Sequence, residues 1–405
     1  MKTVPPGWVP DLGADPEALI KEARRRQHRR YLAVALAIVV LLAGGAGVTV
    51  SVTGLGGHAP NRQGLHLLPP PGRNGASSAA AASSAPPRFF ADAITNSEGN
   101  GSLQVRASAS GGLVAKQERA AGVYGLAATG PGSFIIALQV GDGCATRLYR
   151  VLLSVQGWPG GLWQVGPELQ GLVWSLAAGA GGGVIGYAVS GCAKGDPGYI
   201  GTFDTRTGRS RQWGDIDLGG LSPGNVAMSG ALSISANGGL LAFTGWDVAG
   251  DGRFTSQVVR VLSATAPAGT VAERSRIVLS RPVAKAQLAA ASLSPSGAFF
   301  YLCTQTGSRT GRVTDVARYR TATGEFLADL ASLSGAPTQM WCSMALDTSG
   351  RFLLVPYSLR PAILPMLPTL KVARIDVTTG AVTTLLIQLP GSAGMDQATG
   401  MNAAW

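Results

Sequence analysis

A pattern of small residues, a glycine turn and an apolar run recurs five times between residues 126 and 357. Each copy predicts a strand, a tight turn and a second strand rich in β-branched and aromatic residues. Aligned on the turn glycine, the copies follow one another at intervals of 50, 56, 59 and 53 residues. The five glycines are Gly132, Gly182, Gly238, Gly297 and Gly350. A nearly constant period of this length indicates a repeat fold built from one supersecondary unit.

A second hairpin follows most of these units. It is clearest at residues 199–213, 316–330 and 371–386, where a Thr-Gly pair marks the turn. Residues 258–279 occupy the same place in their unit with a longer turn. Four strands per repeat is the content of one propeller blade, so the sequence predicts an all-β propeller.

The turn motifs resemble those of TolB-like and WD-repeat-like β-propellers. Residues 294–302 (SPSGAFFYL) and 347–355 (DTSGRFLLV) match the first turn of such blades. Residues 203–208 (FDTRTG) and 375–380 (IDVTTG) match their Asp-x-x-Thr-Gly hairpin. The Gly-His and Trp-Asp signature of strict WD repeats is missing. The resemblance covers roughly residues 88–405 and implies a fold but no single activity, because such propellers serve as scaffolds, receptors and enzymes.

Residues 88–405 have room for six blades, with five to seven allowed. Five units are visible, and the two termini are expected to supply the sixth. Residues 88–94 predict its second strand, residues 101–117 its third and fourth strands, and residues 401–405 its innermost strand. The predicted fold class is therefore an all-β, six-bladed β-propeller preceded by one transmembrane helix. Pairing of the two termini removes free sheet edges from the ring.

Four cysteines, Cys144, Cys192, Cys303 and Cys342, lie in the predicted propeller. An even number outside the cytoplasm predicts two disulfides, and four buried thiols are the alternative. In the blade register that the resemblance implies, Cys144 and Cys192 lie in corresponding loops, and Cys303 and Cys342 lie near the same face of adjoining blades. The expected pairs are therefore Cys144–Cys192 and Cys303–Cys342, each stabilising the fold by about 3 to 4 kcal/mol.

An uncharged stretch at residues 31–54 follows a basic run at residues 24–30. About 20 helical residues span about 30 Å, the thickness of a bilayer core. The stretch therefore predicts a signal anchor, and the preceding basic residues predict a cytoplasmic N-terminus. A cleaved signal peptide is the alternative, although its apolar core is normally shorter.

The anchor divides the chain into four predicted parts. Residues 1–30 form a basic cytoplasmic tail, and residues 31–54 span the cell membrane once. Residues 55–87, rich in Pro, Ala and Ser, form a stalk. Residues 88–405 form a propeller ectodomain on the extracytoplasmic side. The expected partners are the membrane and an envelope protein, peptide or glycan.

Charge and residue types exclude several kinds of chemistry. The net charge of +11 is spread along the chain, and an outward-facing domain is not expected to bind nucleic acid. No histidine follows His66, which removes Ser-His and Cys-His catalysis and a zinc site, and no cofactor is expected. Residues 246–253 resemble a calcium loop but lack two of its ligands. The loop carboxylates left as catalytic candidates are Asp142, Asp196, Asp215, Asp217, Asp247 and Asp251.

Aromatic residues and one proline-rich insertion are candidates for binding surfaces. Trp158, Trp163 and Trp174 cluster in the sequence and serve either sugar stacking or packing between blades. Residues 358–370 are rich in proline and apolar residues, and they form either a partner contact or a loop folded onto its own blade.

These features predict a non-catalytic binding or scaffold module at the cell envelope. The alternative is an envelope enzyme, a carboxylate-based glycosidase or a lyase, with its site in the propeller funnel. Several carboxylates and an arginine converging at the central funnel would favour the enzyme, whereas an apolar rim would favour binding. A sensor that signals through the tail is a third hypothesis.

Overall fold

The computed structural model describes residues 85–95, 101–119, 122–141, 144–192, 196–217, 226–249, 253–282, 286–308, 311–335, 342–360, 369–388 and 402–404. The predicted tail, the predicted anchor and the stalk up to residue 84 lie outside these ranges. Within them, no helix has the length and hydrophobicity that crossing a bilayer requires. The two described helices are the short η1 (Ala180–Gly182) and α2 (Val271–Arg274).

Four separate sheets contain a four-strand antiparallel path. The first joins the two ends of the propeller and is called the closing sheet: β27 (Asn402–Ala404), β1 (Phe89–Thr95), β2 (Gly101–Ala107) and β3 (Leu113–Arg119). The second holds β4 (Val123–Gly130), β5 (Ser133–Gln139), β6 (Ala145–Leu153) and β7 (Pro159–Gln164), with β8 (Leu169–Gln170) beside β6. The third holds β19 (Gln287–Leu293), β20 (Phe299–Ser308), β21 (Gly311–Arg320) and β22 (Phe326–Gly335). The fourth holds β23 (Ala345–Leu346), β24 (Phe352–Arg360), β25 (Thr369–Asp376) and β26 (Val382–Gln388).

The remaining strands form one ten-stranded sheet. Its main path is β9 (Leu172–Ala178), β10 (Val184–Ser190), β11 (Gly198–Asp204), β12 (Ser210–Asp217), β13 (Val226–Met228), β15 (Leu240–Val248), β16 (Phe254–Ser263) and β18 (Ser275–Pro282). Strand β14 (Ser233–Ile234) pairs with β15, and β17 (Gly269–Thr270) pairs with β12.

The prediction of six separate blades therefore needs correction. Four sheets have the form of a single blade, and two predicted units are joined in the fifth sheet. The join is a parallel ladder in which Ile216 opposes Val226 and Asp217 opposes Ala227. A short strand laid along an otherwise free sheet edge satisfies backbone groups that the edge would leave open, which explains the fusion.

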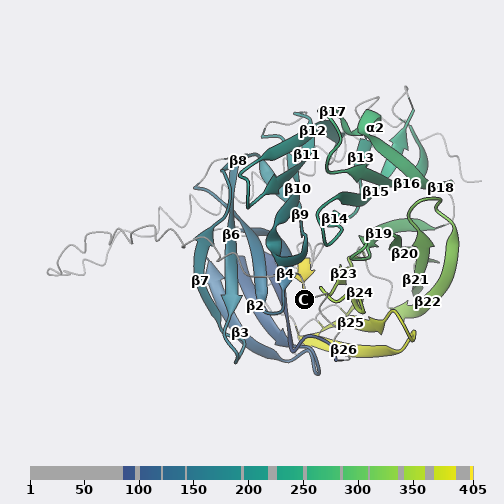
Figure 1. Ribbon diagram of the computed structural model, residues 1–405. Coiled ribbons are helices and arrows are strands. Elements are labelled where there is room, and N and C mark those ends of the chain that lie inside the picture. Colours follow the sequence, from purple (N-terminus) through teal and green to yellow (C-terminus); the bar gives the residue numbers. More distant parts are fainter. Residues whose placement is uncertain are drawn as a thin grey trace, which may run out of the picture. The chain divides into compact units, whose positions relative to one another are not determined.

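The innermost strands contact one another in a closed circle (Figure 1). The order around the circle is β27, β4, β9, β14, β19, β23 and again β27. Hydrophobic clusters fill the spaces between neighbouring sheets. In one of them, Leu103 of the closing sheet packs with Phe134 and Ile136 of β5. This all-β, propeller-like fold buries both faces of its second strands, which explains continuous apolar runs such as SFIIALQ in β5.

The turn glycines that defined the repeat have the backbone conformation that the prediction requires. Gly297 has a φ of 71°, in the left-handed region that other residues rarely adopt. Gly324, in a Thr-Gly hairpin, also has a φ of 71°. A Cβ atom on Gly324 would lie 1.8 Å from the carbonyl oxygen of Val278 in the neighbouring sheet. Glycine is therefore needed at position 324 both for the positive φ of the turn and for the close approach of the two sheets.

The predicted pairing of the termini is confirmed. Strand β27 lies antiparallel to β1, with Ala404 opposite Ala91 and Asn402 opposite Ala93. Ala404 is 4% exposed and packs in the same cluster as Ala91 and Phe134. The first and last described strands thus complete one sheet and its core.

Deleting residues 401–405 should lower the melting temperature of the full-length protein by roughly 5 °C, because the deletion removes the β1–β27 hydrogen bonds and one buried apolar contact. Differential scanning calorimetry would measure the shift. Deletion of residues 1–20 serves as the control and should leave the melting temperature unchanged. Equal melting temperatures for the intact chain and the C-terminal deletion would contradict the closure of the ring.

Candidate functional site

The up-and-down strand order gives the propeller two distinct faces. The first-to-second and third-to-fourth turns of each unit lie on one face, called here the turn face; examples are residues 154–158, 179–183 and 205–209. The second-to-third connections lie on the opposite face, called the loop face, as do the passages from one unit to the next. Cys144 and Cys192 lie on the loop face.

A central channel runs between the innermost strands and holds a cavity of about 120 Å³. Each innermost strand contributes small or aliphatic side chains to its wall. One representative from each strand is Ala128, Ala178, Ile234, Leu293, Leu346 and Ala404. Small-molecule sites usually enclose more than roughly 300 Å³, so this channel is narrow for a metabolite.

The polar groups of the channel wall are already bonded within the protein. Asp347 is the one carboxylate among the described lining residues, and it is 3% exposed. Its Oδ1 atom accepts hydrogen bonds from the backbone nitrogens of Arg351 and Phe352, both at 2.8 Å. The Ser233 hydroxyl oxygen accepts a hydrogen bond of 2.8 Å from the backbone nitrogen of Leu293. Asp347 and Ser233 thus stabilise the turn and the channel wall through hydrogen bonds within the protein.

The loop carboxylates predicted as catalytic candidates do not form a centre in the part of the chain that the structure describes. Asp247 forms an ion pair with Arg260 at 2.8 Å. Asp196 is exposed on the loop face, and Asp215 lies in β12 with a φ of 63°. Across the described ranges no group of three or more His, Cys, Asp or Glu residues could hold a metal ion. Asp142 and Asp251 lie outside the described residues, as does the side chain of Asp217.

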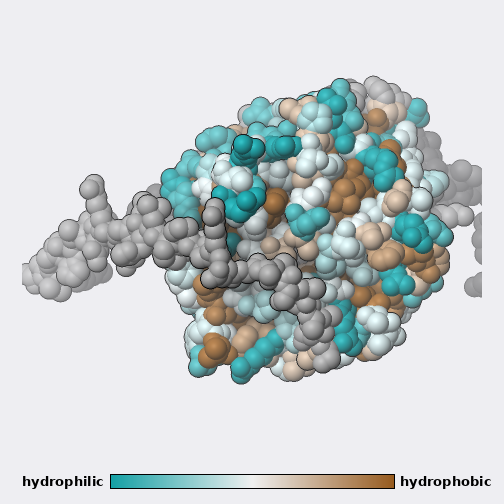
Figure 2. All heavy atoms as spheres, viewed as in Figure 1, coloured by the Kyte–Doolittle hydropathy of each residue, from teal (hydrophilic) through white to brown (hydrophobic). Residues whose placement is uncertain are grey.

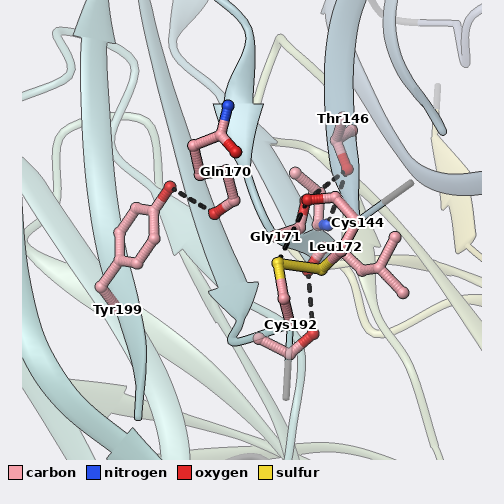
Figure 3. The surroundings of a disulfide bond; sticks show 9 residues. Cys144, Thr146, Gln170, Gly171, Leu172, Cys192 and Tyr199 are labelled. Carbon is pink, nitrogen blue, oxygen red and sulfur yellow. Dashed lines mark hydrogen bonds between the residues drawn. A yellow bond between two sulfur atoms is a disulfide. The ribbon is translucent and has the colours of Figure 1, made fainter. Parts of the chain in front are cut away.

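The first disulfide joins Cys144 and Cys192, as predicted, with their Cα atoms 5.4 Å apart (Figure 3). It connects the end of β5 and the start of β6 with the end of β10 in the next unit. Gly171 lies beside it, where a Cβ atom would come within 2.3 Å of the Ser190 carbonyl oxygen. The Thr146 hydroxyl donates a 2.8 Å hydrogen bond to the Gly171 carbonyl. Disulfide and hydrogen bonds together link two adjoining units on the loop face.

The second disulfide joins Cys303 and Cys342, which confirms the other predicted pair. Their Cα atoms lie 6.5 Å apart, and both side chains are almost fully buried. Cys303 lies in β20, and Cys342 precedes β23 of the next unit, so this bond also connects adjoining units. All four cysteines are therefore bonded, and the alternative of four buried thiols is wrong.

Mild reduction should open the two disulfides in a fixed order, because Cys192 is exposed whereas Cys303 and Cys342 are buried. Low dithiothreitol concentrations followed by alkylation and peptide mapping should label Cys144 and Cys192 first. The same treatment of urea-unfolded protein is the control and should label all four together. Labelling of Cys303 before Cys192 in folded protein would contradict the structure.

A buried ion pair in the closing sheet was not predicted from the sequence. Arg106 donates from Nε to Asp92 Oδ2 at 3.2 Å, and its Nη2 atom donates to the Gln104 side chain. Asp92 is fully buried, and its Oδ1 atom has no hydrogen-bond partner. Burial raises the pKa of Asp92 to about 6, because loss of hydration outweighs the attraction of Arg106. The closing sheet thus contains a carboxyl group whose ionised form is disfavoured by burial.

The raised pKa of Asp92 makes ring stability depend on pH. Because the folded-state pKa of about 6 exceeds the ordinary value of 3.8, the folded protein binds more protons between these values. This group's contribution to the free energy of unfolding should therefore fall as pH rises from about 4 to 6. Urea titrations at several pH values should reveal the fall in the natural protein and its absence in Asp92→Asn. Loss of the ion pair with Arg106 also lowers the free energy of unfolding of the variant, but by the same amount at every pH, so it does not affect the slope. Equal pH slopes for the natural protein and Asp92→Asn would refute the raised pKa of Asp92.

Arginines that bridge neighbouring units were also not predicted from the sequence. Arg276 donates to the carbonyls of Ala322 at 2.8 Å and Thr321 at 3.2 Å. Arg374 donates to the Ser108 carbonyl at 2.7 Å, across 266 residues of sequence. Corresponding bonds to turn carbonyls of the adjoining unit come from Arg88, Arg150 and Arg211. These five residues, the junction arginines, all act on the turn face, and their carbonyl partners are uncharged.

The tryptophans divide between packing and exposure. Trp213 is fully buried and donates from Nε1 to the Pro267 carbonyl at 3.1 Å, so it packs between units. Trp158 and Trp174 are 59% and 41% exposed, and Trp163 is half-buried. On the side of the molecule in Figure 2, hydrophobic residues form several separate groups among hydrophilic ones. Most of the proline-rich insertion, residues 361–368, lies outside the described residues.

Comparison with known proteins supports no family assignment. No protein-family model matches the chain, and no curated protein matches its sequence.

Solved structures with a similar arrangement include TolB and WD40 propellers. TolB from Acinetobacter baumannii is 13% identical with a TM-score of 0.48, and the match covers 78% of this chain and 66% of that one. The WD40 domain of Toxoplasma gondii coronin is 12% identical with a TM-score of 0.41, covering 75% and 69%. The periplasmic gluconolactonase PpgL of Pseudomonas aeruginosa is 14% identical with a TM-score of 0.42, covering 75% and 97%. The chain resembles TolB and WD40 propellers, while its own sheet order and closed ring of inner strands define it as propeller-like.

Proposed function

We propose that this protein is a membrane-anchored, extracytoplasmic propeller that binds a protein, peptide or glycan without catalysis. The observation that carries the proposal is the central channel, which is lined mainly by small and aliphatic residues and whose one described carboxylate, Asp347, accepts hydrogen bonds within a turn. Propeller enzymes of the kind considered above would need several charged groups free in that funnel. The channel therefore supports a binding role over a carboxylate-based hydrolase or lyase.

The ring is best counted as six blades. Dividing the ten-stranded sheet at the parallel ladder between β12 and β13 yields two units of the same four-strand form as the others. Six innermost strands then alternate with six core clusters around the channel. On this count, the ladder is a secondary contact between two blades.

The two disulfides favour an oxidising compartment, which agrees with the sequence-based prediction that residues 31–54 anchor the chain with residues 88–405 outside. Both bonds join adjoining blades, and the more exposed one lies on the loop face. A surface held in one conformation loses less entropy when it binds a partner. The loop face is therefore proposed as the recognition surface.

Site-specific photo-crosslinking in cells that naturally make the protein tests this proposal. A photoreactive residue at Pro197, which is exposed on the loop face, should yield discrete adducts with an envelope component. A photoreactive residue at Asp329, exposed on the outer strand β22, is the matched control and should yield none. Adducts at both positions alike, or at neither, would contradict recognition by the loop face.

A further inference from the structure

We infer that the turn face of the propeller docks against an anionic lipid surface, an inference that rests on the membrane anchoring proposed above. The first observation is the place where the chain enters the fold. Arg88 immediately precedes β1, and its backbone carbonyl accepts a 3.0 Å hydrogen bond from Ser108 in a turn of the closing sheet. The Arg88 guanidinium donates to the Val155 carbonyl at 3.0 Å in a turn of the next unit. The segment that leads back toward the predicted anchor therefore leaves from the turn face.

The second observation is an excess of positive charge on that face. Three exposed arginines belong to no junction: Arg206 and Arg209 in a hairpin, and Arg274 at the end of α2. Three exposed junction arginines, Arg88, Arg211 and Arg276, bind carbonyls and so keep their full charge available. In the described part of the chain, none of the six forms an ion pair with a carboxylate. The side chains that hold adjoining blades together thus also make this face cationic.

The loop face differs in charge. Arg147, which lies near it, forms an ion pair with Glu168 at 2.8 Å. Asp196 adds an exposed negative charge on the same face. Among the described residues, Arg253 is the one exposed arginine of the loop face, against the six named on the turn face, so attraction to an anionic surface favours one orientation of the disc.

Apolar side chains accompany the arginines where the chain enters. Val155 is 76% exposed and Trp158 is 59% exposed, and both lie in the turn that Arg88 contacts. Tryptophan is enriched at the interface between lipid and water, where its ring lies among headgroups. Each arginine near an anionic membrane adds to the attraction. A turn that carries tryptophan, valine and arginine beside the entering chain suits such an interface.

Chain length keeps this face near the membrane. About 30 residues separate the predicted anchor from Ala85, and a chain of that length spans roughly 30 Å as a random coil and at most about 100 Å when extended. A surface tethered within this reach meets the bilayer at high effective concentration. Docking of the turn face leaves the loop face pointing away from the membrane, toward envelope partners.

Hydrogen exchange of the full-length protein in lipid nanodiscs tests the orientation. Peptides covering residues 154–158 and 205–209 should exchange several-fold more slowly in discs with phosphatidylglycerol than in discs of phosphatidylcholine alone. Salt at about 1 M should abolish the difference, because it shortens the Debye length to about 3 Å. The variant Arg206→Glu with Arg209→Glu should lose the protection. The matched control, Arg253→Glu with Arg312→Glu, carries the same charge change on the loop face and should keep it.

The outcomes separate this inference from the proposed function. Failure of the full chain to enter either kind of disc would overturn the proposed anchoring, and the same exchange comparison with added vesicles would then decide whether the turn face binds anionic lipid. Insertion without lipid-dependent protection, equal protection in both kinds of disc, or protection on the loop face would overturn the docking alone. Protection of the same peptides by soluble polyphosphate but not by anionic discs would assign the face to an anionic polymer and refute lipid docking.

Discussion

The pairing of β27 with β1 is the interaction on which the rest of the structure depends. Each core cluster lies between two neighbouring four-strand units, so no unit buries its apolar faces alone. Without β27, the sheet holding β1 to β3 would lack its innermost strand, and the circle of inner strands would end at β4 and β23. Small side chains at Ala91, Ala93 and Ala404 allow this pair to fit in the crowded centre. Ring closure is therefore a contact between the two ends of the described fold, whose paired residues are at least 309 positions apart in sequence (402 − 93).

Local chemistry explains why much of the fold could be predicted from the sequence. The turn glycines Gly297 and Gly324 have backbone conformations that favour glycine. The regular spacing of such glycines along the sequence therefore predicted the repeat. The disulfide pairs followed once that register was known. The fusion of two units was not predictable, because it depends on a three-residue strand, β13, finding the edge of β12. Neither were the Asp92–Arg106 pair and the bond from Arg374 to Ser108, because they depend on how long side chains reach across sheets that are distant in sequence.

The two faces of the disc differ in the interactions that hold adjoining units together. Disulfide Cys144–Cys192 connects units on the loop face, whereas arginines bonded to carbonyls connect them on the turn face. A covalent bond adds no charge, while the exposed junction arginines Arg88, Arg211 and Arg276 leave positive charge at the surface. The division of structural roles therefore gives the faces different electrostatic character. The narrow channel between them, with one described carboxylate in its lining, suits a scaffold that presents surfaces more than a pocket that transforms a substrate.

The most direct test of ring closure is a covalent trap between its two partners. Residues directly opposite in an antiparallel pair have Cα atoms about 4.5 to 5.5 Å apart, which a disulfide can bridge. The variant Ala91→Cys with Ala404→Cys joins opposed positions of β1 and β27. Non-reducing peptide mapping of the full-length variant should recover the 91–404 crosslink together with the two native disulfides. Free thiols at positions 91 and 404 alongside intact native disulfides would contradict a ring closed by its two ends.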